Sequence, residues 1–231
     1  MVLKAVKSGG HQLALIDDLL SYNQNARKRI DSESLAVMDR ATQSLKDSGF
    51  GDGIVKVGDK VPNFEVDLID DSKFSLEYAL SKGPGVIKFY RGGWCPYCNL
   101  ELQSYQQMIG KFEAQGMWVL AIAPEELDRI SATIQKRDLT FPVAADPSQS
   151  VARSLNLVFS LPKDLISVYE KFGLDIMRTG DGIELPVPAT LIVDRDFTVV
   201  ANFFDLDYTK RKDPSAILEA ARALLSDPSK N

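Results

Sequence analysis

Residues 86–98 read Val-Ile-Lys-Phe-Tyr-Arg-Gly-Gly-Trp-Cys-Pro-Tyr-Cys, and this stretch decides the fold. Its first five residues form a compact apolar run that is typical of a buried strand, and a helical pattern extends from Cys98 to about Gln115. Pro96 suits the first turn of such a helix, because a backbone N–H at that position has no intrahelical partner. The stretch therefore predicts a strand, a short turn and a helix that begins at a pair of cysteines.

Strands and helices alternate on both sides of this stretch. Before it, residues 64–68 and 73–76 have the pattern of two strands joined by a turn, and residues 77–81 have that of a short helix. After it, the pattern predicts strands at 117–123, 143–145, 190–193 and 198–204, and helices at 125–137, 147–155 and 214–225. This order is typical of an α/β fold. We expect a central sheet of about five strands with helices on both faces.

Two segments depart from this alternation. Residues 156–186 fit it poorly, and we predict an insertion with one short helix at 163–171. Residues 1–50 are polar and helix-prone with an apolar stripe, and a glycine-rich break follows them. We therefore predict an N-terminal helical extension over 1–53, which packs or dimerises without chemistry of its own, and one domain over 54–231.

The composition of the chain excludes several classes of function. The 231 residues are 45% hydrophobic and 26% charged, with a net charge of −5 and the two signs interspersed, so there is no basic face for nucleic acid. No apolar run approaches the ~20 residues of a membrane span. Lys4 and Lys7 precede a polar segment, residues 8–12, where a signal peptide needs apolar residues. We expect a cytoplasmic protein that binds neither membranes nor nucleic acid.

The few histidine and cysteine residues exclude further kinds of site. The one histidine, His11, stands beside Gly9 and Gly10 and is interpreted as a solvated tail residue. Two cysteines cannot supply the four Cys or His ligands of a structural zinc site. Asn99 follows Cys98, so the haem-attachment pattern is absent. We expect no metal and no cofactor.

Cys95 and Cys98 are the candidate catalytic residues. The free N–H groups and the dipole at a helix N-terminus favour an anion, which lowers the pKa of a thiol placed there. Residues three apart on a helix have Cβ atoms ~5–6 Å from each other, close enough for a disulfide after a small adjustment. Two buried structural cysteines are the alternative. Both cysteines of the chain at this spacing, between a strand and a helix, favour a redox-active pair.

A family resemblance extends over much of the chain. Residues 89–102, around the cysteines, resemble peroxiredoxin-like proteins of the alkyl hydroperoxide reductase/thiol-specific antioxidant family. Residues 58–64 resemble the family's entry strand, and residues 141–146 resemble its middle strand. Residues 186–194 resemble the strand that faces the active site, and residues 207–211 resemble the tail. It covers roughly residues 57–225 and implies a thioredoxin-like fold of the peroxiredoxin type. It does not explain residues 1–50.

The match to the peroxiredoxin motif is incomplete. Peroxiredoxins use P-x-x-x-T-x-x-C, which ends in the cysteine that attacks peroxide. In this chain that cysteine is Cys98, the threonine position is Cys95 and the proline position is Arg91. An arginine that the family usually places before the late strand falls at Pro188. Arg91 could supply the missing positive charge from a new position, or it could be a solvated loop residue.

The cysteine motif itself also resembles thioredoxin. There the first cysteine, Cys95, is the exposed nucleophile and Cys98 resolves. Pro188 then fits the cis-proline that thioredoxins place beside the cysteine pair, and X–Pro bonds tolerate cis at the start of a strand. We expect Pro188 in cis near the pair. We also expect Cys95, the more exposed cysteine, to carry disulfide exchange, and Cys98 to react with peroxide.

Three functions remain open from the sequence. The first is a thiol-dependent peroxidase, in which a thiolate becomes a sulfenic acid, the second cysteine condenses with it, and thioredoxin or another thiol reduces the disulfide. The second is a protein or small-molecule disulfide reductase. The third is a non-catalytic redox-sensing module whose N-terminal arm binds a partner. A homodimer is possible in each case.

Four further residues have open roles. Trp94 could shield the thiolate, recognise a partner or simply pack. Glu101 could move protons, although a solvated helix face is the simpler interpretation. Tyr208 and Arg211 could approach the site from the tail, but the sequence cannot place them.

Overall fold

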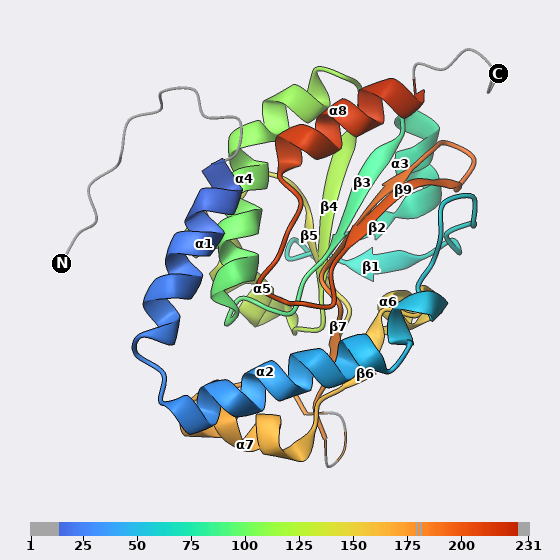
Figure 1. Cartoon of the computed structure of the whole chain (residues 1–231). Helices are drawn as coiled ribbons and strands as arrows, with labels where there is room; N and C mark the ends of the chain where they lie inside the picture. Colours follow the sequence, from blue (N-terminus) through green and yellow to red (C-terminus); the bar gives the residue numbers. More distant parts are fainter. Residues whose placement is uncertain (1–13, 179, 181, 226–231) are drawn as a thin grey trace.

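The computed structural model describes residues 14–178, 180 and 182–225, and its centre is a mixed β-sheet (Figure 1). His11 lies outside the described residues. The central strand β3 (Gly85–Phe89) is buried at all five positions, runs parallel to β4 and antiparallel to β8, and so explains the apolar run in the sequence. In spatial order the strands are β2 (Lys73–Ser75), β1 (Glu65–Asp67), β5 (Val143–Ala145), β4 (Trp118–Ala123), β3, β8 (Ala189–Val193) and β9 (Val199–Phe204). The described sheet thus has seven strands, where the sequence predicted about five.

Helices cover both faces of this sheet, as predicted. One face is packed by α4 (Pro96–Glu113), α5 (Leu127–Arg137) and α8 (Pro214–Leu225), and the other by α3 (Leu76–Lys82) and α6 (Ser150–Ser154). Alternate side chains of β3 point to opposite faces of the sheet. Val86 packs in the core on the α4 side, and Ile87 and Phe89 pack in the core on the α3 side. The site therefore rests on a strand that is held from both sides.

The predicted N-terminal helices are α1 (Ala14–Arg27) and α2 (Ser32–Asp47), and they pack on different parts of the molecule (Figure 1). Leu15 and Leu19 of α1 enter the same buried cluster as the cysteines of α4. Val37 of α2 joins a separate cluster with residues of α7 (Lys163–Lys171). A short 3-10 helix, η1 (Phe50–Gly53), follows at the predicted glycine-rich break.

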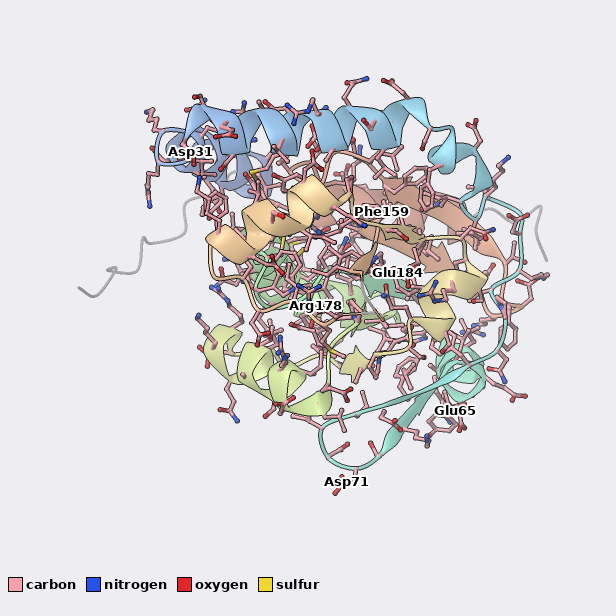
Figure 2. The ribbon with its side chains drawn as sticks, turned by 90° about the horizontal axis from the view of Figure 1, so that it is seen from below. Asp31, Glu65, Asp71, Phe159, Arg178 and Glu184 are labelled. Carbon is pink, nitrogen blue, oxygen red and sulfur yellow. The ribbon has the colours of Figure 1, made fainter. Side chains whose placement is uncertain are left out.

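The segment 156–186 contains the predicted helix, α7, with the predicted bounds. It also contains a two-stranded antiparallel sheet, formed by β6 (Val158–Ser160) and β7 (Glu184–Pro186), which the sequence did not predict. Strands of three residues are too short to show a period of two. Figure 2 views this part of the molecule from below, with Phe159 of β6 and Glu184 of β7 labelled.

Neither a membrane span nor a metal site is found in the part of the chain that the structure describes. None of its helices is long and apolar enough to cross a bilayer. None of its His, Cys, Asp and Glu side chains gather in groups of three that could hold a metal ion.

Candidate active site

Cys95 and Cys98 lie at the turn between β3 and α4, as the sequence predicted. Cys95 is the N-cap residue of α4, Pro96 is in the first turn and Cys98 follows within that turn. The backbone N–H of Cys95 donates to the carbonyl of Gly92 over 3.1 Å, which closes the turn before the helix begins. Both cysteines therefore lie at the N-terminus of α4, where the helix dipole favours an anion.

Two glycines shape this turn. Gly92 has a φ of 138°, and a Cβ atom there would lie 2.4 Å from Nε1 of Trp94. A Cβ atom on Gly93 would lie 2.1 Å from Oγ1 of Thr133. The backbone N–H of Gly93 donates to Glu125 Oε2 over 2.8 Å, and burial raises the pKa of that carboxyl group. The turn is thus fixed by close packing against α5 and the end of β4.

The Cys98 sulfur is surrounded by groups that favour a thiolate. Burial alone would raise its pKa, but three groups outweigh burial and lower the pKa to about 5: a hydrogen bond from Cys95, the charge of Arg211 and the backbone N–H of Arg91. Arg211 Nη2 donates to Cys98 Sγ over 3.3 Å. Burial and the neighbouring Cys98 thiolate both raise the pKa of Cys95. The pair therefore consists of an anionic Cys98 and a protonated Cys95 that donates to it.

The expectation of a solvent-exposed Cys95 is wrong, because both cysteines are buried. Cys95 is 1% exposed and Cys98 is 0% exposed, and both are free thiols. The reason is a set of three tyrosines: Tyr97 contacts Tyr22 of α1 at 5.2 Å and Tyr208 at 5.6 Å, measured between ring centroids. Aromatic side chains from the N-terminal extension and from the loop after β9 thus cover the start of α4, which in isolation would be open to solvent.

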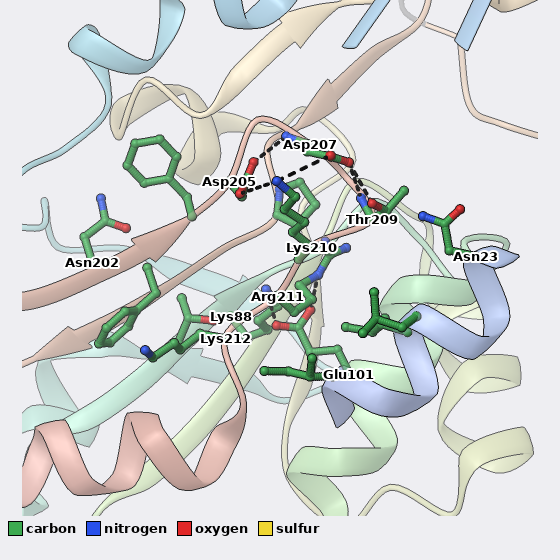
Figure 3. Close-up of a pocket in the computed structure, with 17 residues that line it drawn as sticks. Asn23, Lys88, Glu101, Asn202, Asp205, Asp207, Thr209, Lys210, Arg211 and Lys212 are labelled. Carbon is green, nitrogen blue, oxygen red and sulfur yellow. Dashed lines mark hydrogen bonds and ion pairs between the residues drawn. The ribbon is translucent and has the colours of Figure 1, made fainter. Parts of the chain in front are cut away.

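Three buried charges form what we call the ion cluster: Lys88, Glu101 and Arg211 (Figure 3). Lys88 Nζ lies 2.8 Å from Glu101 Oε1, and Arg211 Nε lies 2.5 Å from Glu101 Oε2, with all three side chains at most 2% exposed. Burial lowers the pKa of Lys88, and Glu101 opposes that effect. The solvated position that the sequence favoured for Glu101 is therefore wrong, because this face of α4 lies against the sheet.

Arg91 is buried as well, which excludes the solvated loop position. Its guanidinium carbon lies 4.7 Å from the ring centroid of Tyr208, 4.8 Å from that of Trp94 and 5.6 Å from that of Tyr169. Nη2 of Arg91 donates to the Tyr169 hydroxyl over 2.7 Å, whereas Nε has no hydrogen-bond partner among the described residues. Trp94 therefore packs against a cation that also lies near both cysteines.

Arg211 and Arg91 line different cavities. The larger, about 660 Å³, has Arg211 and the other members of the ion cluster in its lining, and charged side chains of the loop after β9 surround it (Figure 3). The smaller, about 220 Å³, has Arg91 in its lining and mostly apolar walls. Neither of these two cavities is lined by Cys95 or Cys98.

The sequence of this chain matches the AhpC/TSA family model over residues 57–202, well over half of its length. The chain belongs to the AhpC/TSA family. The matched residues include β3, the cysteine turn and α4, and they end in β9 before Arg211. They begin after the N-terminal helices.

This AhpC/TSA chain is similar in sequence to proteins of two kinds. It is 27% identical over 105 residues to the thiol-disulfide oxidoreductase ResA of Bacillus thuringiensis subsp. konkukian, which is 45% of this chain and 60% of that protein. It is 28% identical over 115 residues to the 1-Cys peroxiredoxin PER1 of Hordeum vulgare, 47% of this chain and 52% of that protein. The chain thus spans about 50–60% of the length of these relatives.

Solved structures share the fold of this AhpC/TSA chain. Peroxidoxin BcpB of Mycobacterium tuberculosis is similar with a TM-score of 0.58 at 21% identity, over 74% of this chain and 98% of that one. Prx3 of Vibrio vulnificus is similar with a TM-score of 0.59 at 14% identity, over 72% and 99% of the two chains. The thioredoxin-like, peroxiredoxin-type fold expected from the sequence is confirmed.

Pro188 differs from the expectation in one respect. The Val187–Pro188 peptide bond is trans, like every peptide bond in the described part of this AhpC/TSA chain, so the predicted cis-proline is wrong. The residue nevertheless lines both cavities, beside Arg91 in one and Arg211 in the other. β8, which pairs with β3 along its whole length, holds the proline there without a cis bond.

Sequence reasoning missed Lys88 and Tyr169, and it left Arg211 without a position. One signal was available: Lys88 stands inside an otherwise apolar run, and a buried lysine needs a partner of opposite charge. The partner, Glu101, lies three residues after Cys98 and so on the same helix face. No comparable signal marks Tyr169, which reaches Arg91 from the insertion.

Proposed function

We propose that this AhpC/TSA protein is a thiol-dependent peroxidase in which Cys98 attacks the peroxide and Cys95 resolves the product. One observation carries the proposal: Arg211 Nη2 lies 3.3 Å from Cys98 Sγ, in a site that lowers the pKa of this thiol to about 5. At neutral pH the sulfur is then a thiolate, which is the nucleophilic form.

The proposed cycle uses only the two cysteines. The Cys98 thiolate attacks the terminal oxygen of a hydroperoxide, the O–O bond breaks, and the departing oxygen takes a proton from water to leave as an alcohol or as water. Sulfur is oxidised to a sulfenic acid and the peroxide is reduced. The Cys95 thiol then forms a disulfide with Cys98 and releases water. Thioredoxin, or another dithiol of that class, returns both cysteines to thiols.

Thiol–disulfide exchange on other proteins is the second candidate function. A longer match favours it: the ResA protein of Oceanobacillus iheyensis is 27% identical over 163 residues, which is 69% of this chain and 78% of that protein. The burial of Cys95 and its raised pKa argue against it, because attack on a bulky disulfide needs an exposed thiolate. A peroxide is small enough to reach a buried sulfur.

Single cysteine variants test the proposal. Each cysteine is replaced by serine, peroxide is added, and sulfenic acid is trapped with dimedone and detected by mass spectrometry. We expect Cys95→Ser to form sulfenic acid and Cys98→Ser to form none. If only Cys98→Ser forms it, the roles are reversed. If neither variant reacts faster than free cysteine, the peroxidase proposal is wrong.

Two assays on the same wild-type sample separate the candidate functions. We expect peroxide consumption when thioredoxin, its reductase and NADPH are supplied, and slow reduction of insulin disulfides. The reverse result would favour disulfide exchange. If the sample is inactive in both assays, the redox-sensing module becomes the favoured function.

The division into an extension over 1–53 and a domain over 54–231 is also part of the proposal, supported by a family match that begins at residue 57. A homodimer stays a prediction.

A further inference from the structure

Both sulfurs are inaccessible to a protein reductant. Cys95 is 1% exposed and Cys98 is 0% exposed. The proposed cycle nevertheless ends with a dithiol protein, whose thiolate must touch one sulfur of the Cys95–Cys98 disulfide. The attacking thiolate belongs to the reductant, so the raised pKa of Cys95 does not limit this step, whereas the cover over the pair does. At least one covering element must therefore move.

Two elements cover the start of α4, and one of them is firmly held. The loop after β9 contributes Tyr208, and α1 contributes Tyr22. The Tyr208 ring centroid lies 4.7 Å from the guanidinium carbon of the buried Arg91, and Arg211 Nη1 donates to the Tyr208 carbonyl over 2.8 Å. Two buried arginines thus fix the loop after β9.

α1 is attached to the domain in a different way. It packs mainly against α4, at the edge of the molecule (Figure 1). The buried side chains that it contributes there, Leu15 and Leu19, are apolar. The ion pair at its C-terminal end, between Arg27 Nη2 and Asp39 Oδ2 at 2.8 Å, joins it to α2 and has both side chains about half exposed. Apolar contacts therefore hold α1 on the domain.

Cavities lie on both sides of α1. The larger cavity, about 660 Å³, has Leu20 and Asn23 of α1 in its lining. Another cavity, about 240 Å³, is lined by Asn23 and Ala26 of α1 and by Tyr97 of α4. Asn23, which Figure 3 labels on α1, lines both, so this part of α1 separates them. If α1 lifted away, the two would join into one groove, lined by Tyr97 and by Arg211, the hydrogen-bond donor to the reacting sulfur.

α2 provides a fixed support for such a movement. Val37 packs in the cluster with α7, and Lys171 Nζ of α7 lies 2.9 Å from Asp31 Oδ2, at the start of α2. Figure 2 shows α2 beside α7, with Asp31 labelled. Residues 28–30 join α1 to α2 and belong to neither helix. α1 can therefore rotate about residues 28–30 while α2 keeps its place.

We propose that α1 is a lid on the cysteine pair, which lifts about residues 28–30 and admits a dithiol protein of the thioredoxin class to the face beneath it; the lid rests on the proposed peroxidase function. α1 lies before the residues that match the family model, so the lid belongs to the extension of this chain.

The open lid serves one half of the proposed cycle. The thiolate of the reductant attacks one sulfur, the Cys95–Cys98 bond breaks, and a mixed disulfide forms while the released sulfur takes a proton. The second thiol of the reductant then loses its proton and attacks the mixed disulfide, so the reductant is oxidised by two electrons and both cysteines are thiols again. Hydrogen peroxide is little larger than water, and we expect it to reach Cys98 with the lid closed. Only reduction by a protein then depends on the lid.

A pair of neighbouring substitutions in α1 tests the lid. Leu19→Ala removes a 5% exposed contact with the domain, and Leu20→Ala, at a 55% exposed position, is the matched control. The disulfide form of each protein is prepared with diamide, which oxidises dithiols without peroxide. Its reduction by thioredoxin is followed by acid quenching, alkylation and mass spectrometry. In a second experiment, the reduced protein is mixed with hydrogen peroxide in a stopped-flow instrument.

We expect the rate of reduction by thioredoxin to rise at least about tenfold in Leu19→Ala, because a lost buried leucine favours the open lid by this order. The rate with hydrogen peroxide in Leu19→Ala, and both rates in Leu20→Ala, should stay within about threefold of the wild type.

Several outcomes would overturn the lid. These are an unchanged rate with thioredoxin in Leu19→Ala, an equal rise in both half-reactions, or a wild-type disulfide that thioredoxin does not reduce. If the wild type does not react with hydrogen peroxide, the peroxidase proposal is wrong. Because the disulfide is prepared with diamide, the reduction experiment still decides whether α1 is a lid.

A measurement on the wild type covers the case in which Leu19→Ala does not fold. The reduced protein is labelled with a maleimide that carries a polyethylene glycol chain, at increasing concentrations of urea below the unfolding transition. We expect the labelling rate to depend on urea much less steeply than global unfolding does, because opening the lid exposes only the contact surface of α1. A dependence as steep as that of global unfolding would overturn the lid.

Discussion

The cysteine pair lies between two layers of different chemistry. On one side is the ion cluster, in which Lys88 and Arg211 flank Glu101, and Arg211 reaches Cys98 directly. On the other side is what we call the aromatic layer, in which three of the rings contact the guanidinium of Arg91. This layer comprises Tyr22, Trp94, Tyr97, Tyr169 and Tyr208.

The two layers also differ in origin. Two of the three members of the ion cluster, Lys88 of β3 and Glu101 of α4, lie inside the family match, and Arg211 lies after its end. The aromatic layer draws Tyr22 from the N-terminal extension and Tyr169 from the insertion. The difference teaches that the two layers contribute differently to the thiolate: the ion cluster supplies the direct donor Arg211, whereas the aromatic layer covers the cysteines and holds Arg91, which also lowers the pKa of Cys98.

Removing the charge on the ion-cluster side should have the largest effect. In Arg211→Met the thiolate loses its direct donor, and the rate of peroxide reduction at neutral pH should fall by about a hundred- to thousandfold, as for other lost donors to a reacting anion. Stopped-flow measurement of peroxide consumption checks this. Arg195→Met, at an exposed position in the β8–β9 turn, is the matched control. A fall of less than about twofold in Arg211→Met would remove the distinction between the layers.

A substitution in the aromatic layer should act on stability instead. In Tyr169→Phe the buried Arg91 loses the hydroxyl that now accepts from Nη2 over 2.7 Å. The free energy of unfolding should fall by about 1–3 kcal/mol, because a buried charged donor is left unpaired. Urea unfolding measures this, with Tyr78→Phe at a 65% exposed position as control. An accompanying loss of the thiolate at neutral pH would show that the two layers act together.

The pH dependence tests the charge state of Cys98 without any substitution. With the pKa of Cys98 at about 5, absorbance of the thiolate at 240 nm should be constant at neutral pH and fall about tenfold for each unit below the pKa. Because this pKa is lower than the ordinary value of 9.0, the thiolate contributes stability that is complete above pH 9 and is lost as the pH falls through 5. A transition near 9 in the reduced protein would contradict the role of the ion cluster.

Much of the fold could be predicted because its signals are local. The apolar run at 86–90, the helical period after it and the helix at 163–171 each depend on neighbouring residues, and the structure confirms all three. The β6–β7 pair was missed because its two strands of three residues each lie 26 positions apart, with no turn between them to mark a hairpin.

The candidate site was only partly predictable, because its electrostatics depend on distant residues. Cys95 and Cys98 could be placed at the helix start from the motif alone. The contact between Arg211 and Glu101 joins residues 110 positions apart, and no periodicity indicates it. The burial of Cys95 depends on Tyr22 and Tyr208, and these side chains come from elements that no local pattern directs toward the cysteines.

The charges around Cys98 also bear on electron transfer. In the reduced protein the thiolate and Glu101 carry two negative charges, and Lys88 and Arg211 carry two positive ones. Forming the disulfide removes one negative charge from this buried group and leaves a cation without its counterpart. A dithiol that is stabilised in this way makes its disulfide the stronger oxidant. The disulfide of this protein should therefore draw electrons readily from a donor of modest reducing power, and its reduction potential should lie above that of a structural disulfide.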